Sequence, residues 1–186
     1  MLQAILTATV AVALAEMGDK TQLLALSLAA RFRQPWSVIG GIFVATVANH
    51  LLAASVGVRV AAWLGPDWMR WLVGGAFLAF AAWTLVPDDE PESAGHAGYG
   101  GAFATTAVLF FFAEMGDKTQ LATVALAARH PDVIAVTTGT TAGMMISDGL
   151  AVFVGDRMGE RLDPVLLRRV AAGLFAVLGV VTLIGA

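Results

Sequence analysis

The stretch AEMGDKTQL occupies residues 15–23 and occurs a second time, unchanged, at residues 113–121. Each copy places two acids and a lysine between runs of Ala, Leu, Val and Phe, and these two lysines are the only ones in the chain. An identical stretch in both halves predicts a chain built from two copies of one unit. The apolar surroundings make the charges costly, so their repetition indicates a functional requirement.

The composition around the repeat is that of an integral membrane protein. Of 186 residues, 58% are hydrophobic and 13% are charged, with a mean hydropathy of +0.78. Soluble domains carry about 25% charged residues, so this chain has roughly half the usual share. The absence of cysteine excludes disulfides, thiolate metal sites and thiol catalysis. The chain has no cluster of basic residues that would indicate a nucleic-acid partner. The expected environment is a lipid bilayer.

Apolar segments bounded by charged residues or proline predict six transmembrane helices, most of them close to the ~20 residues that cross a bilayer. The expected spans are Leu2–Ala30, Trp36–Val60, Trp68–Val86, Gly101–Ala128, Val133–Val154 and Pro164–Ile184. Ala13-Leu14-Ala15 has the pattern of a signal-peptidase site. No Lys or Arg precedes it, however, so residues 1–30 are expected to remain as a mature span.

A shift from residue 15 to residue 113 superposes the halves outside the motif too, matching Gly57 with Gly155 and Pro66 with Pro164. Three spans per half force the second half to start from the opposite side of the membrane. The predicted fold is therefore all-α, with two inverted three-helix repeats at residues 1–87 and 101–186, an architecture typical of transporters. Residues 88–100, acidic and rich in Gly and Pro, are expected to form a flexible linker.

The arginines predict the orientation, because Lys and Arg are enriched in cytoplasmic loops. One side holds Arg31, Arg33, Arg157, Arg161, Arg168 and Arg169, and the other holds Arg59, Arg70 and Arg129. The first side and the linker 88–100 are therefore expected in the cytoplasm, with both termini outside, in a multi-pass protein of the cell inner membrane.

The motif is predicted to lie deep in the bilayer. A helix over residues 2–15 rises only about 21 Å, less than the roughly 30 Å hydrocarbon core. An ionisable group at that depth costs at least ~2.5–3.5 kcal/mol on insertion scales. In a continuous helix, Asp19 and Lys20 follow Glu16 by three and four positions, which places all three on one face.

Two motifs brought together by the two-fold axis would hold four carboxylates and two ammonium groups, a formal charge of −2. The candidate metal ligands are Glu16, Asp19, Glu114 and Asp117. This charge suits one divalent cation, or two protons in its absence. Gly18 and Gly116 permit either a close helix contact or a local unwinding that frees backbone carbonyls.

Other polar residues of the spans complete the candidate site. They are Lys20, Thr21, Gln22, Lys118, Thr119, Gln120, Asn49, Ser147 and Asp148. Carboxylate, hydroxyl and amide oxygens favour hard ions such as Mg²⁺, Ca²⁺ and Mn²⁺. Zinc or copper is less favoured, because cysteine is absent and His50 is the one intramembrane histidine nearby in sequence; for His50 itself, packing and proton transfer both stay open. Carboxylates at low dielectric favour the neutral form, so they could take up protons when metal leaves.

An alternative interpretation makes the Glu–Lys pairs structural staples between the first and fourth spans. A buried ion pair contributes little net stability, however, and two identical copies exceed what a staple needs.

The doubled motif Glu-x-Gly-Asp-Lys-Thr, at residues 16–21 and 114–119, closely resembles the signature of one transporter family. It is the family of bacterial manganese exporters and Golgi manganese/calcium–proton exchangers. The resemblance covers essentially the whole chain and implies transport of Mn²⁺ or Ca²⁺ against protons, with the motif acids as ligands. The Mn²⁺ and Ca²⁺ preference is implied by this resemblance alone.

The sequence thus predicts a divalent cation/proton antiporter, with metal as transported substrate rather than cofactor, acting as a monomer or homodimer. One alternative is an exporter of another small solute with the same repeats. A second is an intramembrane enzyme using the acids for acid/base catalysis, although such enzymes usually add Ser, His or Arg clusters near the membrane surface.

Overall fold

The computed structural model describes residues 1–17, 19–86, 100–158 and 164–185. The described residues form seven helices and no strand, which confirms the all-α class. The helices are α1 (Leu2–Glu16), α2 (Lys20–Phe32), α3 (Pro35–Thr84), α4 (Ala102–Glu114), α5 (Lys118–Arg129), α6 (Val133–Met158) and α7 (Pro164–Ile184). Most of the linker predicted at 88–100, together with Arg161, lies outside the described residues.

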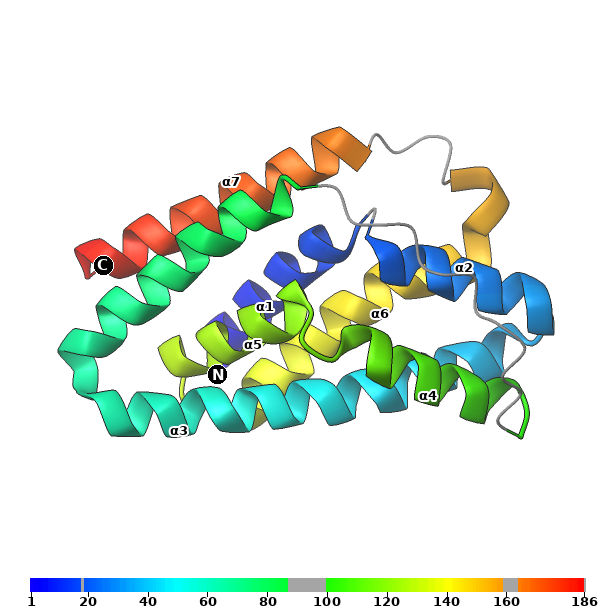
Figure 1. Ribbon diagram of the computed structural model, residues 1–186, viewed down its shortest axis with the longest axis horizontal. Helices are drawn as coiled ribbons and strands as arrows, with labels where there is room; N and C mark the ends of the chain where they lie inside the picture. Colours follow the sequence, from blue (N-terminus) through cyan, green and yellow to red (C-terminus); the bar gives the residue numbers. More distant parts are fainter. Residues whose placement is uncertain (18, 87–99, 159–163, 186) are drawn as a thin grey trace.

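The helix bounds differ from the predicted spans at three places. The first and fourth spans are each broken within the motif, into α1 and α2 and into α4 and α5. The second and third spans form one helical run, α3, which changes direction between two arms that lie at an angle to each other (Figure 1). Gly65-Pro66 falls in this run, and a proline inside a helix removes a backbone hydrogen bond and kinks it.

Among the described residues, one helical arm, Pro35–Trp63, is by itself long and apolar enough to cross a membrane. The bent pair α1 and α2 passes the same test when counted as a single span. Ala102–Glu114 and Arg169–Ile184 are shorter apolar helices. The six crossings predicted from the sequence therefore stay a prediction.

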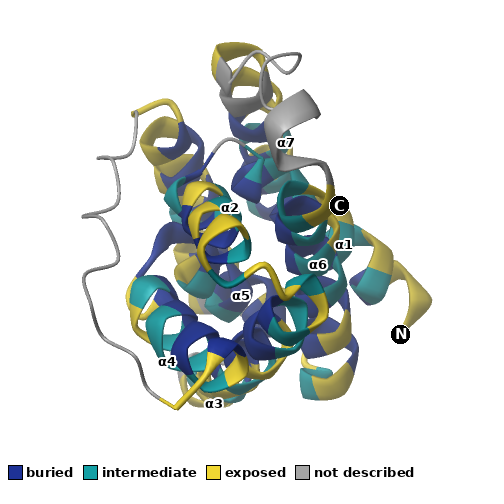
Figure 2. Ribbon diagram, turned by 90° about the vertical axis from the view of Figure 1, so that its right-hand side faces the viewer, coloured by how far each residue is buried: buried dark blue, intermediate teal, exposed yellow. Residues whose placement is uncertain are grey.

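Two apolar clusters hold the bundle together, one on each side of the motif. The first contains α1 up to Ala15 and α5 from Ala122 onward, with Phe77 and Phe175 stacked at a ring-centroid distance of 6.2 Å. The second contains α2 from Leu24 onward and α4 up to Phe110. In Figure 2 the buried faces of the helices point inward. The motif residues thus lie between two hydrophobic clusters.

Close helix crossings repeat between the halves. A Cβ on Gly41 would lie 2.7 Å from the carbonyl oxygen of Phe103, because α3 and α4 approach through a residue without a side chain. A Cβ on Gly139 would lie 2.5 Å from the carbonyl oxygen of Ile5, where α6 meets α1. Gly139 corresponds to Gly41, and Phe103 corresponds to Ile5, under the same shift that relates the two motifs. The two crossings are therefore equivalent contacts with the halves exchanged.

Candidate metal centre

Both copies of the motif interrupt a helix. Helix α1 ends at Glu16 and α2 starts at Lys20 after a bend of 74°. The second copy repeats the arrangement, with α4 ending at Glu114 and α5 starting at Lys118. Gly116 adopts φ +81°, a left-handed conformation that glycine tolerates best. Of the two roles predicted for the motif glycines, Gly116 therefore serves the local unwinding of the helix.

The break places an aspartate at the start of each downstream helix. Asp19 caps α2, and the backbone N–H of Lys20 donates to Asp19 Oδ1 at 2.7 Å. Asp117 occupies the equivalent position before α5. The positive end of a helix macrodipole favours a carboxylate there. This arrangement explains how acids are held at these buried positions.

Because the helix ends between them, Glu16 and Lys20 do not share a helical face, and that prediction is wrong. The unwound segment instead directs each lysine to the opposite motif. Lys20 Nζ lies 2.9 Å from Asp117 Oδ1, and Lys118 Nζ lies 3.2 Å from Asp19 Oδ2. The same ion pair therefore forms twice with the halves exchanged.

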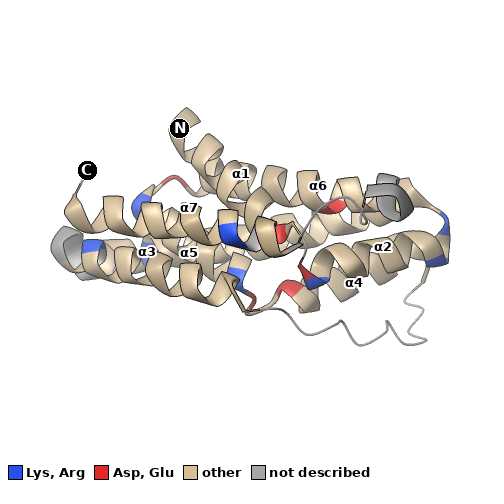
Figure 3. Cartoon of the chain, turned by 90° about the horizontal axis from the view of Figure 1, so that it is seen from above, with Lys and Arg blue, Asp and Glu red and all other residues tan. Residues whose placement is uncertain are grey.

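Three of the four candidate ligands lie together. Glu16, Asp19 and Asp117 are buried, and each offers a carboxylate oxygen within 4.8 Å of the other two. Figure 3 shows acidic and basic residues near the middle of the molecule, where the broken helices meet. Closely spaced carboxylate oxygens are the ligands that hard divalent cations prefer.

Threonines from both motifs contact Glu16. Thr21 Oγ1 donates to Glu16 Oε2 at 2.6 Å, and Thr119 Oγ1 donates to Glu16 Oε1. Thr119 is the counterpart of Thr21, yet it crosses to the other half instead of bonding Glu114. Glu16 is thus held by both repeats at once.

Glu114 and Asp148 are arranged differently. Both are completely buried, and no described residue donates a hydrogen bond to either carboxylate. Glu114 lies outside the group of three acids, although it is close enough to Glu16, Asp117 and Asp148 to interact electrostatically with them. The sequence predicted four acids as metal ligands. In the structure the carboxylate oxygens of three of them lie within 4.8 Å of one another, and Glu114 and Asp148 lie beside this group.

The remaining candidates are divided between the two halves. Gln22 Nε2 donates to the carbonyl oxygen and hydroxyl of Ser147, at 3.3 and 3.4 Å. Gln120 instead accepts from the backbone N–H of Gly116 at 2.8 Å, within its own motif. Asn49 Nδ2 donates to the carbonyl of Phe111 at 2.9 Å, one turn before Glu114. Both ring nitrogens of His50 are buried without a hydrogen-bond partner among the described residues.

Sequence reasoning missed a group of buried threonines. The hydroxyls of Thr46, Thr106, Thr137 and Thr141 have no hydrogen-bond partner among the described residues. A signal was present, since TTGTT at residues 137–141 is an unusually polar stretch in an apolar span. Hydroxyl oxygens of this kind are neutral acceptors and can also coordinate hard cations.

The chain is similar to known proteins along most of its length. The family described as "Divalent cation/proton antiporter GDT1" matches residues 4–92 and 102–186. A "Putative manganese exporter" of Vibrio cholerae is 45% identical over 92% of this chain and 86% of its own. "GDT1-like protein sll0615" of Synechocystis is 26% identical over 98% of this chain and 97% of its own. No solved structure matches the chain.

Proposed function

The chain belongs to the GDT1 family of divalent cation/proton antiporters, and we propose that it exports Mn²⁺ or Ca²⁺ from the cytoplasm in exchange for protons. One relative of similar length is named for manganese export, which favours Mn²⁺ as a substrate of this chain. The exporter would lie in the cell inner membrane with residues 88–100 on the cytoplasmic side.

The observation that carries the proposal is the buried group of Glu16, Asp19 and Asp117 at the junction of the broken helices. Three carboxylates this close repel each other unless cations neutralise them, and the ammonium groups of Lys20 and Lys118 do so at two of the three. Hydroxyl groups of Thr21 and Thr119 already orient Glu16. A hard divalent ion fits these oxygen ligands.

The acids beside this group support exchange with protons. Glu114 and Asp148 are buried without a hydrogen-bond donor among the described residues. A carboxylate in such surroundings must be neutralised by a cation or a proton. We infer that these two acids, with Glu16, bind protons and metal alternately. Metal release on one side would then be coupled to proton uptake.

The reciprocal contacts support alternating access by two inverted repeats, at residues 1–87 and 101–186. Gly41 and Gly139 form equivalent crossings, and the two lysine–aspartate pairs exchange the halves. Phe77 and Phe175, equivalent under the same shift, stack on each other as residues on a two-fold axis would. Rocking of one repeat against the other would open the site to each side in turn.

Metal-dependent proton flux in proteoliposomes tests the function. We expect Mn²⁺ or Ca²⁺, and not Mg²⁺, to drive proton movement in the wild type, and Glu114→Gln to abolish it. Asp132→Asn is the matched control, because Asp132 caps α6 away from the cluster and asparagine also caps helices. Flux with a small organic solute but with no metal would favour the other class of exporter.

A test in cells addresses the ligands separately. Asp19→Asn and Asp117→Asn each remove a charge from the group of three acids, so each should abolish protection of cells against excess Mn²⁺. Full protection by either variant at wild-type abundance would contradict the site assignment.

A further inference from the structure

We propose that Lys20 and Lys118 are tethered counter-cations that make the site selective for divalent over monovalent ions. This inference rests on the proposed function and assigns a role to the two lysines within that same site. Each ammonium group occupies the position of a bound cation until a divalent ion displaces it.

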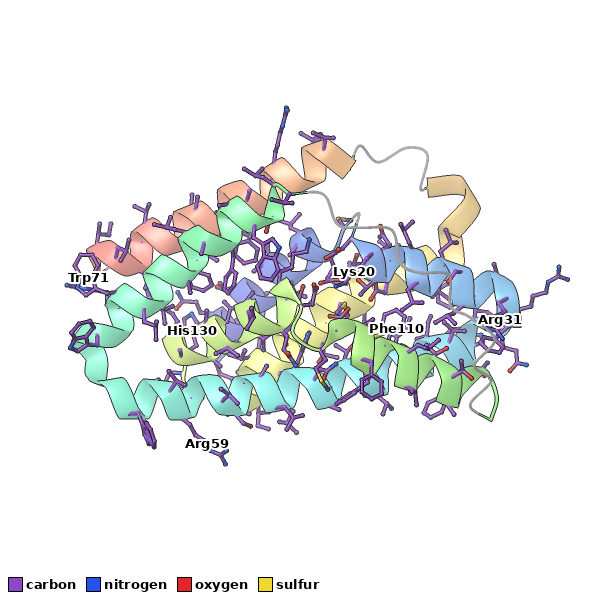
Figure 4. The ribbon with its side chains drawn as sticks, viewed as in Figure 1. Lys20, Arg31, Arg59, Trp71, Phe110 and His130 are labelled. Carbon is purple, nitrogen blue, oxygen red and sulfur yellow. The ribbon has the colours of Figure 1, made fainter. Side chains whose placement is uncertain are left out.

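The geometry places both ammonium groups on carboxylates of the candidate metal ligands. Lys20 Nζ lies 2.9 Å from Asp117 Oδ1, and Lys118 Nζ lies 3.2 Å from Asp19 Oδ2. Both aspartates belong to the group of three acids whose oxygens lie within 4.8 Å. An ion that enters this group therefore competes with an ammonium for each aspartate. Figure 4 shows Lys20 among the oxygen-bearing side chains at the middle of the molecule.

The competition discriminates by charge. Every entering cation loses hydration, a divalent ion more than a monovalent one, but a monovalent cation that replaces an ammonium only exchanges one unit charge for another. A divalent cation gains twice the Coulomb attraction to each carboxylate. The lysine is moreover covalently held at the site, so its effective concentration is far higher than that of a free ion. Na⁺ and K⁺ are thus excluded, whereas Mn²⁺ and Ca²⁺ are able to displace the lysines.

The lysine side chain is suited to such a role. A compact charge on a flexible four-carbon stem can withdraw from a carboxylate and return without backbone movement. The two pairs differ in burial, since the Lys20 side chain is 31% exposed and that of Lys118 is 4% exposed. Lys20 therefore has room to withdraw in this conformation. In the opposite conformation, in which the two halves exchange their surroundings, Lys118 would be the more exposed lysine and would have room to withdraw.

Cation binding to the purified full-length protein tests the proposal. Binding of Mn²⁺ and the thermal shift caused by Na⁺ are measured for the wild type, Lys20→Gln and Lys118→Gln. We expect Na⁺ to leave the wild-type melting temperature unchanged and to raise that of both variants. In the absence of Na⁺, each variant should bind Mn²⁺ about tenfold more tightly, because one competing charge is gone. Added Na⁺ should weaken Mn²⁺ binding in the variants alone.

Two further variants serve as controls. Lys20→Arg keeps a positive charge that holds carboxylates more firmly than lysine, so it should exclude Na⁺ and weaken Mn²⁺ binding. Arg59→Gln removes an exposed charge on α3, far from the site in Figure 4, and should change nothing. If a glutamine variant does not fold, Lys20→Met and Lys118→Met also remove the charge and keep an unbranched side chain, and exclusion of Na⁺ by these variants would overturn the proposal.

The outcomes separate this proposal from the proposed function. Weaker Mn²⁺ binding in both glutamine variants, or no response to Na⁺, would overturn the role of the lysines while the wild type still binds metal. A wild type without saturable binding of Mn²⁺ and Ca²⁺ would overturn both.

Discussion

Thr119 is the residue through which the second repeat reaches the acid of the first. Its hydroxyl donates to Glu16, although Glu114 is the acid of its own motif. We expect Thr119→Val, which keeps the shape and removes the hydroxyl, to weaken Mn²⁺ binding roughly 10- to 100-fold, as loss of a residue supporting a metal ligand usually does. The dissociation constant for Mn²⁺ measures the effect.

Thr119→Ser is the matched control, because serine retains the hydroxyl that Glu16 accepts from. Its affinity should stay close to that of the wild type. Equal affinities for the valine and serine variants would show that Glu16 is positioned without Thr119.

Gly116 tests whether the helix break depends on backbone conformation. A Cβ there would meet no atom within 4 Å, so a substitution costs no packing. Its φ of +81° remains unfavourable for a residue with a side chain. We expect Gly116→Ala to reduce the free energy of unfolding by about 1–3 kcal/mol, measured as a lower melting temperature in detergent.

Gly173→Ala gives the comparison for that result. Gly173 lies within helix α7 and a Cβ would again meet open space, so alanine should leave the melting temperature unchanged or raise it slightly. If Gly116→Ala were as stable as Gly173→Ala, the positive φ would not be needed for the break.

The helix crossings are the equivalent test at the scale of elements. A Cβ at Gly41 or Gly139 would press on the backbone of the neighbouring helix, which cannot move aside as a side chain can. We expect Gly41→Ala and Gly139→Ala each to destabilise the protein by about 1–3 kcal/mol. Thermal unfolding of the two variants should give similar losses, because the crossings are equivalent.

Gly75 separates close packing from the general effect of alanine in a helix. It lies in the same long helix, α3, and has open space where a Cβ would stand. Gly75→Ala should therefore be neutral. A neutral Gly41→Ala would show that α3 and α4 do not approach as closely as described.

The sequence predicted the last two helices as single elements, because their apolar runs have recognisable ends. Helices α6 and α7 start at Val133 and Pro164 as expected. Val133 lies two residues after Pro131, and Pro164 is itself a proline. The break within the motif was foreseen only as one of two options for its glycines. Continuous helicity was assumed in placing Glu16 and Lys20 on one face, and the interruption removes that periodicity.

The pairing across the motifs could not be predicted from one copy of the motif. Spacing in the sequence describes neighbours along a helix, whereas Lys20 and Asp117 meet because two interrupted helices face each other. The different surroundings of Glu16 and Glu114 have no counterpart in the sequence either, since the two motifs are identical there. Outside the motif the halves do differ in sequence, since His50 of the first half corresponds to Asp148 of the second.

At the scale of the whole molecule, the inverted arrangement can be tested with the two loops that correspond under the repeat. Arg33, between α2 and α3, is the counterpart of Pro131, between α5 and α6, and both are exposed. Two inverted repeats must place these positions on opposite sides of the membrane. The chain has no cysteine, so each single substitution gives a unique labelling site.

We expect Arg33→Cys to react with a membrane-impermeant thiol reagent only after the cytoplasmic face is opened. Pro131→Cys should react in intact spheroplasts, and so should Gln3→Cys, because both termini are expected outside. Labelling of Arg33→Cys and Pro131→Cys from the same side would exclude inverted repeats. The reciprocal ion pairs would then belong to two repeats that cross the membrane in the same direction. Such repeats could not exchange the exposures of Lys20 and Lys118 by opening to the other side of the membrane.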